Sequence, residues 1–361
     1  MFQKLEAYKS NVHEIMDRMN KLYDAAAQRK GGNVIFRVLL NSDVDVYSNI
    51  KINEYKYEDD IEKYAYDLCK VMEESFIARI SVPDDAIPIL SPVLGIGDYS
   101  AFVTGDIYFT KDTSWSRPSL KNLSDYKKLE PLGTAPWYNR FLKICEQIMI
   151  NSKGSGIPFT RGFFSPLDLA EALRGTEIYT DFYDDPEGVH ELLDFCATAT
   201  IQFAEDIYAL ARKYLGEEEY AMWYLDGVIN MSEDIACMIS PEIYREFEAP
   251  HTQRVINHFG RGHMHCHSRA LYLVKEICSL DNVVNIWVAT DPNQPRPIDN
   301  LEQLIKDANG VCLAIDCESI DELEANIEIA KKGNVSICLP VKDLAEGIAV
   351  TEQFRKLMRE E

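Results

Sequence analysis

The stretch GHMHCHSRALYLVKEICSLDNVVNIWVAT, residues 262–290, contains one complete unit of the pattern that decides the fold. It begins and ends with short runs typical of β-strands, 262–267 and 283–290, and the segment between them has the apolar spacing of a helix. Strands joined through a helix lie parallel, and parallel strands are usually covered on both faces. The unit therefore predicts a parallel sheet flanked by helices.

The same unit recurs along the second half of the chain. The predicted strands are 157–164, 220–228, 262–267, 283–290, 311–317 and 334–341, and two more lie upstream at 33–40 and 78–84. Helix starts between them are marked by Ser165-Pro166, by Ser240-Pro241 and by a capping box that begins at Ser319. Eight strands are the number that closes a (β/α)8 TIM barrel, which is the α/β fold we predict.

One segment, 85–135, breaks this alternation. It is rich in proline and glycine, and we expect it to form a long excursion or hairpin over the barrel mouth. No linker or low-complexity tract divides the chain, and barrels can exceed 250 residues as single domains. We therefore predict one domain over residues 1–361, in which residues 1–32 form an N-terminal helical extension.

Composition restricts the class of protein. The chain carries 37 basic and 59 acidic residues, a formal net charge of −22, which repels nucleic acids and anionic lipids. Its nine cysteines include no CxxC pair and are typical of reduced intracellular thiols. The N-terminus predicts a charged amphipathic helix rather than a signal sequence, and no run approaches the roughly 18 apolar residues of a membrane span. We predict a soluble cytoplasmic protein.

Polar residues gather where the predicted strands end, which is where a barrel of this type builds its site. Asp226 closes the strand 220–228, and Asp291 follows the strand 283–290. Arg161 lies near the end of 157–164, and Cys338 lies inside the last strand. Either aspartate could instead cap the helix or turn that follows it.

Three of the seven histidines fall within residues 263–267. Strand side chains alternate, so His263, His265 and His267 share one face, while Met264 and Cys266 share the other. A His-x-His pair on one strand face can present two nitrogen ligands to zinc. The rings could instead contact a substrate without metal, or be structural.

Three quoted segments carry a resemblance to a known family. IPFTRGFFSPLDLAEALRGTEIYTDFYDDPEGVHELLDF (157–195), MSEDIACMISPEIYREFEAPHTQRVINHF (231–259) and GHMHCHS (262–268) resemble the uroporphyrinogen decarboxylase superfamily, and the likeness covers most of 80–345. The resemblance implies a single (β/α)8 barrel with a cleft at the strand ends.

True uroporphyrinogen decarboxylases carry an arginine-rich RQAGR segment near the N-terminus. The corresponding stretch here, NVIFRVLLNSDVDVYS (33–48), offers only Arg37. An octacarboxylate substrate needs several guanidinium groups, and the net charge of −22 disfavours such an anion further. The chain is therefore closer to the other branch of the superfamily, the cobalamin-dependent methyltransferases.

Those methyltransferases bind zinc through an H-x-C pair and a cysteine from a late strand. By this resemblance His265 matches the histidine, His267 stands in place of the cysteine, and Cys338 is the late ligand, with His263 in reserve. The imidazole at 267 departs from the family pattern and makes the metal more electrophilic.

The function predicted is zinc-assisted transfer of a methyl group between a corrinoid protein and a small thiol or folate-type acceptor. Asp226 or Asp291 would hold the acceptor or act as a base, with Arg161 as a further site residue. Two alternatives stay open: a decarboxylase of a tetrapyrrole or other small carboxylate, and a non-catalytic corrinoid or tetrapyrrole binder. A homodimer is compatible with each of these three functions.

Overall fold

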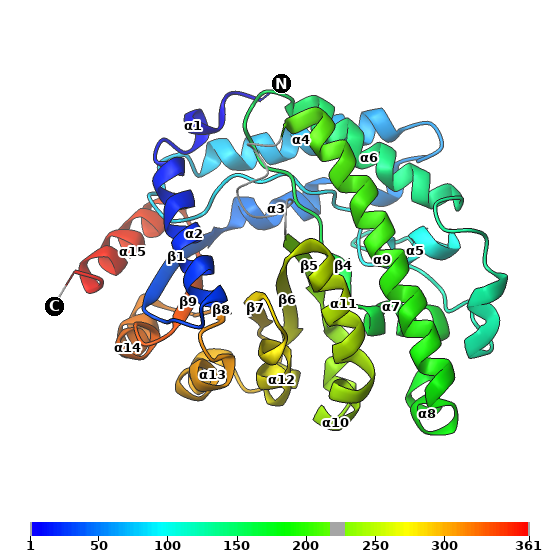
Figure 1. Ribbon diagram of the computed structural model, residues 1–361. Helices are drawn as coiled ribbons and strands as arrows, with labels where there is room; N and C mark the ends of the chain where they lie inside the picture. The colour runs from blue at the N-terminus through cyan, green and yellow to red at the C-terminus, as the bar shows by residue number, and fades with distance from the viewer. Residues whose placement is uncertain (1, 217–227, 360–361) are drawn as a thin grey trace.

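A parallel sheet lies at the centre of the computed structural model, which describes residues 2–216 and 228–359 (Figure 1). Seven strands pair in parallel in the order β1-β9-β8-β7-β6-β5-β4. Their bounds are β1 (Asn33–Leu40), β4 (Phe163–Phe164), β5 (Val228–Ser232), β6 (Arg261–His267), β7 (Val283–Ala289), β8 (Cys312–Asp316) and β9 (Asn334–Val341).

The sequence predicted five of these strands closely. The runs 33–40 and 334–341 match β1 and β9 at both ends. The runs predicted for β6 and β7 differ by one residue at one end, and the run predicted for β8 differs by one residue at each end. Val, Ile and Leu recur along β1, β7 and β9, and almost all of them are buried, as expected of a covered parallel sheet.

The strand predicted at 78–84 is wrong. Helix α4 (Ile61–Ala78) continues to residue 78, and the side chains of Asp84 and Asp85 take the place of a strand beside β1. The carboxylate of Asp85 accepts a hydrogen bond from the Phe36 N–H at 3.0 Å, and that of Asp84 accepts from the Val38 N–H at 2.9 Å. Side-chain oxygens thus replace the carbonyls of a neighbouring strand.

The irregular segment 85–91 then runs between the two edges of the sheet. The Asp85 N–H donates to the carbonyl of Phe36 at 2.8 Å, while Leu90 forms an isolated parallel bridge with Phe159. The run predicted at 157–164 is a regular strand only at its last two residues, which form β4. The segment gives the seven-stranded sheet a barrel-like form.

The run predicted at 220–228 lies outside the described residues, except for Val228. Within the described residues, strand β5 spans Val228–Ser232 and extends four residues beyond the predicted run. The residues that follow its carboxyl end are those near 233.

Helices precede or follow the strands and cover the sheet. The remaining α-helices are α1 (Leu5–Tyr8), α2 (Val12–Ala27), α3 (Asn41–Asn49), α5 (Asp98–Thr104), α6 (Pro136–Ser152), α7 (Pro166–Arg174), α8 (Ile178–Asp184), α9 (Pro186–Leu215), α10 (Pro241–Ile243), α11 (Ala249–Phe259), α12 (Val274–Ser279), α13 (Leu301–Ala308), α14 (Ile320–Ala330) and α15 (Leu344–Leu357). Short helical turns are η1 (Ile52–Glu54), η2 (Leu123–Lys128), η3 (Asp234–Met238), η4 (Tyr244–Glu248), η5 (Ser268–Leu273) and η6 (Pro297–Asn300). The predicted caps are confirmed: Ser165, Ser240 and Ser319 each accept a hydrogen bond from the backbone N–H three residues on.

The excursion predicted at 85–135 contains a hairpin, as expected. Helix α5 is followed by the antiparallel pair β2 (Tyr108–Phe109) and β3 (Ser114–Trp115) and then by η2. Trp115 lines a pocket together with Asp234, which follows β5. The hairpin therefore lies beside the carboxyl end of the sheet.

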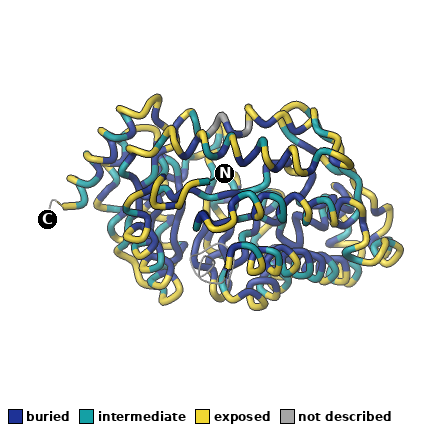
Figure 2. Tube along the Cα trace, turned by 90° about the horizontal axis from the view of Figure 1, so that it is seen from above, coloured by how far each residue is buried: buried dark blue, intermediate teal, exposed yellow. Residues whose placement is uncertain are grey.

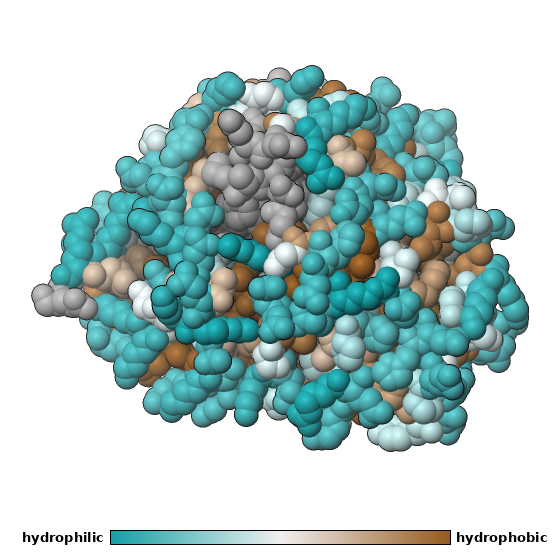
Figure 3. Space-filling model, viewed as in Figure 1, coloured by the Kyte–Doolittle hydropathy of each residue, from teal (hydrophilic) through white to brown (hydrophobic). Residues whose placement is uncertain are grey.

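The N-terminal residues cover the opposite end of the sheet. Helix α2 packs against β1, β7, β8 and β9, and Asp24 pairs with Arg261 at the start of β6, 2.9 Å away. Figure 2 shows buried residues gathered inside and exposed residues on the outer surfaces of the helices, and hydrophilic residues dominate the face drawn in Figure 3. Among the described residues, no helix is long and apolar enough to cross a membrane.

Candidate metal centre

Strand β6 presents its histidines on one face, as the alternation predicts. His265 and His267 are partly exposed, whereas Met264 and Cys266 are buried against the helices. The Cys266 thiol lies near Cys278 of α12, and burial raises its pKa well above the usual value. Cys266 therefore points away from the two imidazoles that flank it.

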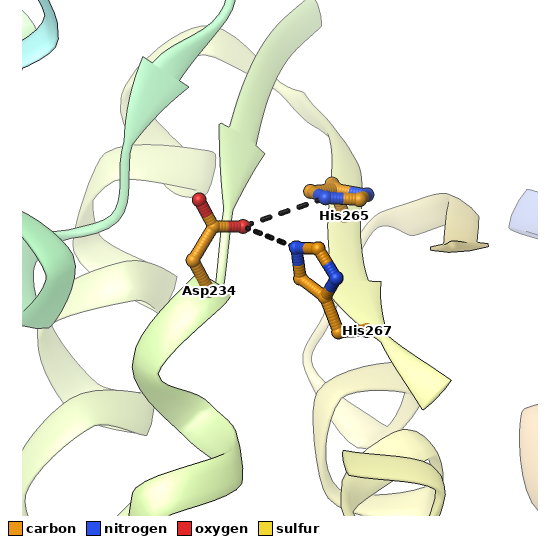
Figure 4. Close-up of side chains that lie close together, drawn as sticks. All are labelled: Asp234, His265 and His267. Atoms are coloured by element: carbon orange, nitrogen blue, oxygen red, sulfur yellow. Dashed lines mark ion pairs between the residues drawn. The ribbon is translucent and has the colours of Figure 1, made fainter. Parts of the chain in front are cut away.

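Asp234 brings a carboxylate to these two rings. It begins η3, two residues after β5 ends, and its Oδ1 lies 3.4 Å from Nε2 of His265 and 3.4 Å from Nε2 of His267. Figure 4 shows both imidazoles turned toward this oxygen. One ligand atom from each residue lies within 4.8 Å of the other two, which is close enough for all three to bind one ion.

Two further contacts fix the orientation of the rings. Nδ1 of His265 donates to the carbonyl of Trp287 at 3.2 Å, and Nδ1 of His267 donates to Asp291 Oδ1 at 2.9 Å. Because these oxygens only accept, each Nδ1 carries a proton and each Nε2 faces Asp234. A carboxylate or carbonyl behind the outer nitrogen is the usual support of a metal-binding histidine.

The two imidazoles differ in their proton affinity. The hydrogen bond to Asp234 raises the pKa of His267 to about 9, and the charge of Asp291 adds to this effect. Burial lowers the pKa of His265, partly offset by Asp234. Metal binding at His267 would therefore displace a proton, as expected when a cation takes the place of a hydrogen ion.

Asp168 positions the loop that carries Asp234. This aspartate on α7 is 2% exposed, and it accepts hydrogen bonds from the Asp234 N–H at 2.8 Å and the Ile235 N–H at 3.0 Å. The Ser232 hydroxyl donates to it at 2.7 Å. These contacts fix the direction in which η3 leaves β5, so Asp168 is a positioning residue that the sequence analysis did not identify.

The donor set fits a catalytic divalent metal. Two imidazole nitrogens and one carboxylate oxygen are common ligands of zinc, and three protein ligands leave a position open for substrate. The same set also suits non-haem iron.

The residues predicted for the site are only partly together. His265, His267 and Asp291 meet, while Cys338 lies on β9, three places from β6 in the sheet, and is not part of the group with Asp234. His263 lies deeper on β6, where its ring packs against Tyr23 of α2 with the centroids 4.7 Å apart.

Arg161 lies elsewhere, and Asp226 cannot be placed beside it or the imidazoles because it falls outside the described residues. The guanidinium of Arg161 is 2% exposed and pairs with Asp98 at 2.8 Å among the rings of Tyr99 and Phe203. The carboxylate beside the two imidazoles is that of Asp234, and the acidic turn MSEDIA (231–236) was its signal in the sequence.

Comparison with known proteins gives a likeness of fold. No protein-family model matches the chain, and no curated protein matches it. The fold matches that of a methyltransferase from Methanosarcina mazei with a TM-score of 0.57 and 12% sequence identity, over 86% of this chain and 91% of the other. A weaker likeness, to a B12-independent methionine synthase from Shewanella sp. W3-18-1, has a TM-score of 0.44 and 12% identity over 81% of this chain and 90% of the other. The match to the Methanosarcina protein shows that the two chains share a fold.

Proposed function

We propose that the protein is a metal-assisted methyltransferase that moves a methyl group between a corrinoid protein and a small acceptor. The observation that carries the proposal is the convergence of His265, His267 and Asp234 at the carboxyl end of a parallel sheet. The fold shared with a methyltransferase supports it. We further propose that segment 85–91 stands in for the eighth strand of a (β/α)8 barrel.

The ligands proposed for zinc are His265, His267 and Asp234, with Asp234 replacing the cysteine expected from the late strand. Zinc bound there would act as a Lewis acid and lower the pKa of an acceptor thiol. Asp291 holds the His267 ring in the tautomer that leaves Nε2 for the metal, and the Trp287 carbonyl does the same for His265. The partly exposed rings leave the acceptor a route to the open position.

Metal content of the purified protein tests the ligand set. Protein prepared without chelator or histidine tag should contain about one zinc per chain. Asp234→Asn, His265→Ala and His267→Ala should each lose most of it. Cys338→Ser and Cys266→Ser are the controls and should keep it, because neither thiol belongs to the group.

Turnover is then followed with methylcobalamin as donor and a simple thiol as acceptor. The zinc-loaded protein should form the thioether, and Asp234→Asn should not. If the wild type holds no metal, or if Cys338→Ser strips the metal while Asp234→Asn keeps it, the proposed centre is wrong. Full metal content without methyl transfer to thiols or to folate-type acceptors would refute the proposed reaction.

A further inference from the structure

A cavity of about 660 Å³ opens at the carboxyl ends of β1, β7, β8 and β9, beside the metal centre. Its volume lies within the range of small-molecule sites, roughly 300–1,000 Å³. Most of its wall is apolar, with contributions from Leu39, Met72, Phe76, Ile87, Trp287 and Pro340. Such a wall favours a ligand that buries apolar surface.

Trp287 joins this cavity to the metal centre. Its indole lines the cavity and is 46% exposed, and its ring centroid lies 4.4 Å from that of His265. Its carbonyl also accepts the hydrogen bond from His265 Nδ1. A molecule lying on Trp287 is therefore separated from a zinc ligand by a single side chain.

The charges that line the cavity balance. Three are cationic (Arg37, Arg79 and Arg296) and three are anionic (Asp43, Asp316 and Glu318), so their formal sum is zero, in contrast to −22 for the whole chain.

These charges are also engaged with one another or with neighbours. Arg79 contacts Asp43 at 2.6 Å, and Arg296 contacts Glu322 at 2.6 Å. The charge of Arg37 acts on Asp316, where it opposes the rise in pKa that burial causes. Because these ionic groups already have partners, they would not compensate the charge of a ligand. A ligand with a net charge would therefore lose its hydration on entering the apolar cavity without gaining a partner, which costs free energy.

We infer that this cavity binds the methyl acceptor, and that the acceptor is an uncharged, mainly apolar molecule whose ring lies on Trp287. That the bound molecule is the methyl acceptor rests on the proposed function, whereas the binding of an uncharged, apolar molecule in the cavity does not. The acceptor is then a neutral thiol with an apolar body. Folate-type molecules are excluded as acceptors because they carry carboxylates.

Binding of two matched probes tests this inference in metal-free protein kept in chelator. 2-Naphthol is uncharged near neutral pH, whereas 2-naphthoate has the same rings and a negative charge. Isothermal titration calorimetry should show saturable binding of naphthol, at least about tenfold tighter than that of naphthoate. Equal affinity for the two probes, or no saturable binding of naphthol, would overturn the inference.

Two pairs of variants locate the binding. Trp287→Leu and Leu39→Asp alter the cavity, and each should weaken naphthol binding at least about tenfold. Their controls are Trp115→Leu and Leu344→Asp, which lie outside the cavity with nearly equal exposure, 44% against 46% and 37% against 38%.

The controls should bind naphthol as the wild type does. If they weaken binding as much as the cavity variants do, the probe binds elsewhere and the inference fails. Because no metal is present, these results are independent of the zinc measurements. If naphthol does not bind as expected, the proposed metal centre is unaffected. If the wild type proves to hold no metal, the assignment of the cavity is unaffected.

Discussion

Replacing His263 with phenylalanine should reduce the dependence of folding stability on pH. The His263 ring is 4% exposed beneath α2, and burial lowers its pKa to about 3, with Arg261 contributing. In the unfolded chain a histidine takes up a proton near pH 6.5. Between these two values the unfolded state binds a proton that the folded state excludes.

The sign and size follow from this difference. The contribution of His263 to stability is fully present above pH 6.5 and is lost as the pH falls toward 3. Each pH unit in this window costs 1.36 kcal/mol for a single group. From pH 7 to pH 5 the loss due to His263 is therefore about 2 kcal/mol.

Urea unfolding of metal-free protein at pH 7 and at pH 5, followed by tryptophan fluorescence, measures this loss. The free energy of unfolding of His263→Phe should fall by about 2 kcal/mol less than that of the wild type between the two pH values. Met264→Leu, one residue on and buried on the other face of β6, controls for disturbance of the strand. Equal losses in His263→Phe and the wild type would mean that the folded protein protonates this ring, and the reasoning would be wrong.

Three other predictions concern the site and the fold. Asp291→Asn should weaken zinc affinity about 10- to 100-fold in competition with a chelator, because it removes the support of His267; unchanged affinity would show that the contact is dispensable. Arg161→Met should cost about 3–5 kcal/mol in urea unfolding, because Asp98 is left buried without its partner. Adding Asp98→Leu should recover part of that loss, and a smaller loss than 1 kcal/mol for the single variant would contradict the burial argument. Limited proteolysis should yield no pair of stable fragments divided near residue 150, since such fragments would indicate two domains.

Most of the sheet could be predicted because its strands are determined locally. Every second residue of β1 and β9 is apolar without interruption, so the extent of each strand is visible in the residues themselves. Segment 85–91 could not be predicted in this way, because its place beside β1 depends on hydrogen bonds that the carboxylates of Asp84 and Asp85 accept from the N–H groups of that strand. Side-chain partners of this kind have no periodicity.

Part of the candidate site could also be predicted from local sequence, and part could not. Alternation along β6 is enough to place His265 and His267 together. Asp234 comes from another strand, and its position depends on the register in which Ser232 of β5 lies opposite His265. With this register, Asp234, two residues after Ser232, comes to lie beside His265 and His267. Nothing in the local sequence specifies the register. Cys338 failed to join the group for the related reason that strand order separates β9 from β6.

The carboxylates of Asp84 and Asp85 have a consequence for the behaviour of the protein in a crowded solution. Strand β1 pairs with β9 on one side, and its other side would expose N–H groups able to recruit a strand from another chain. The two aspartates occupy the N–H groups of Phe36 and Val38, and their charges are matched by Lys9, Arg18 and Arg79. An edge that could seed aggregation is thus closed by ionic side chains.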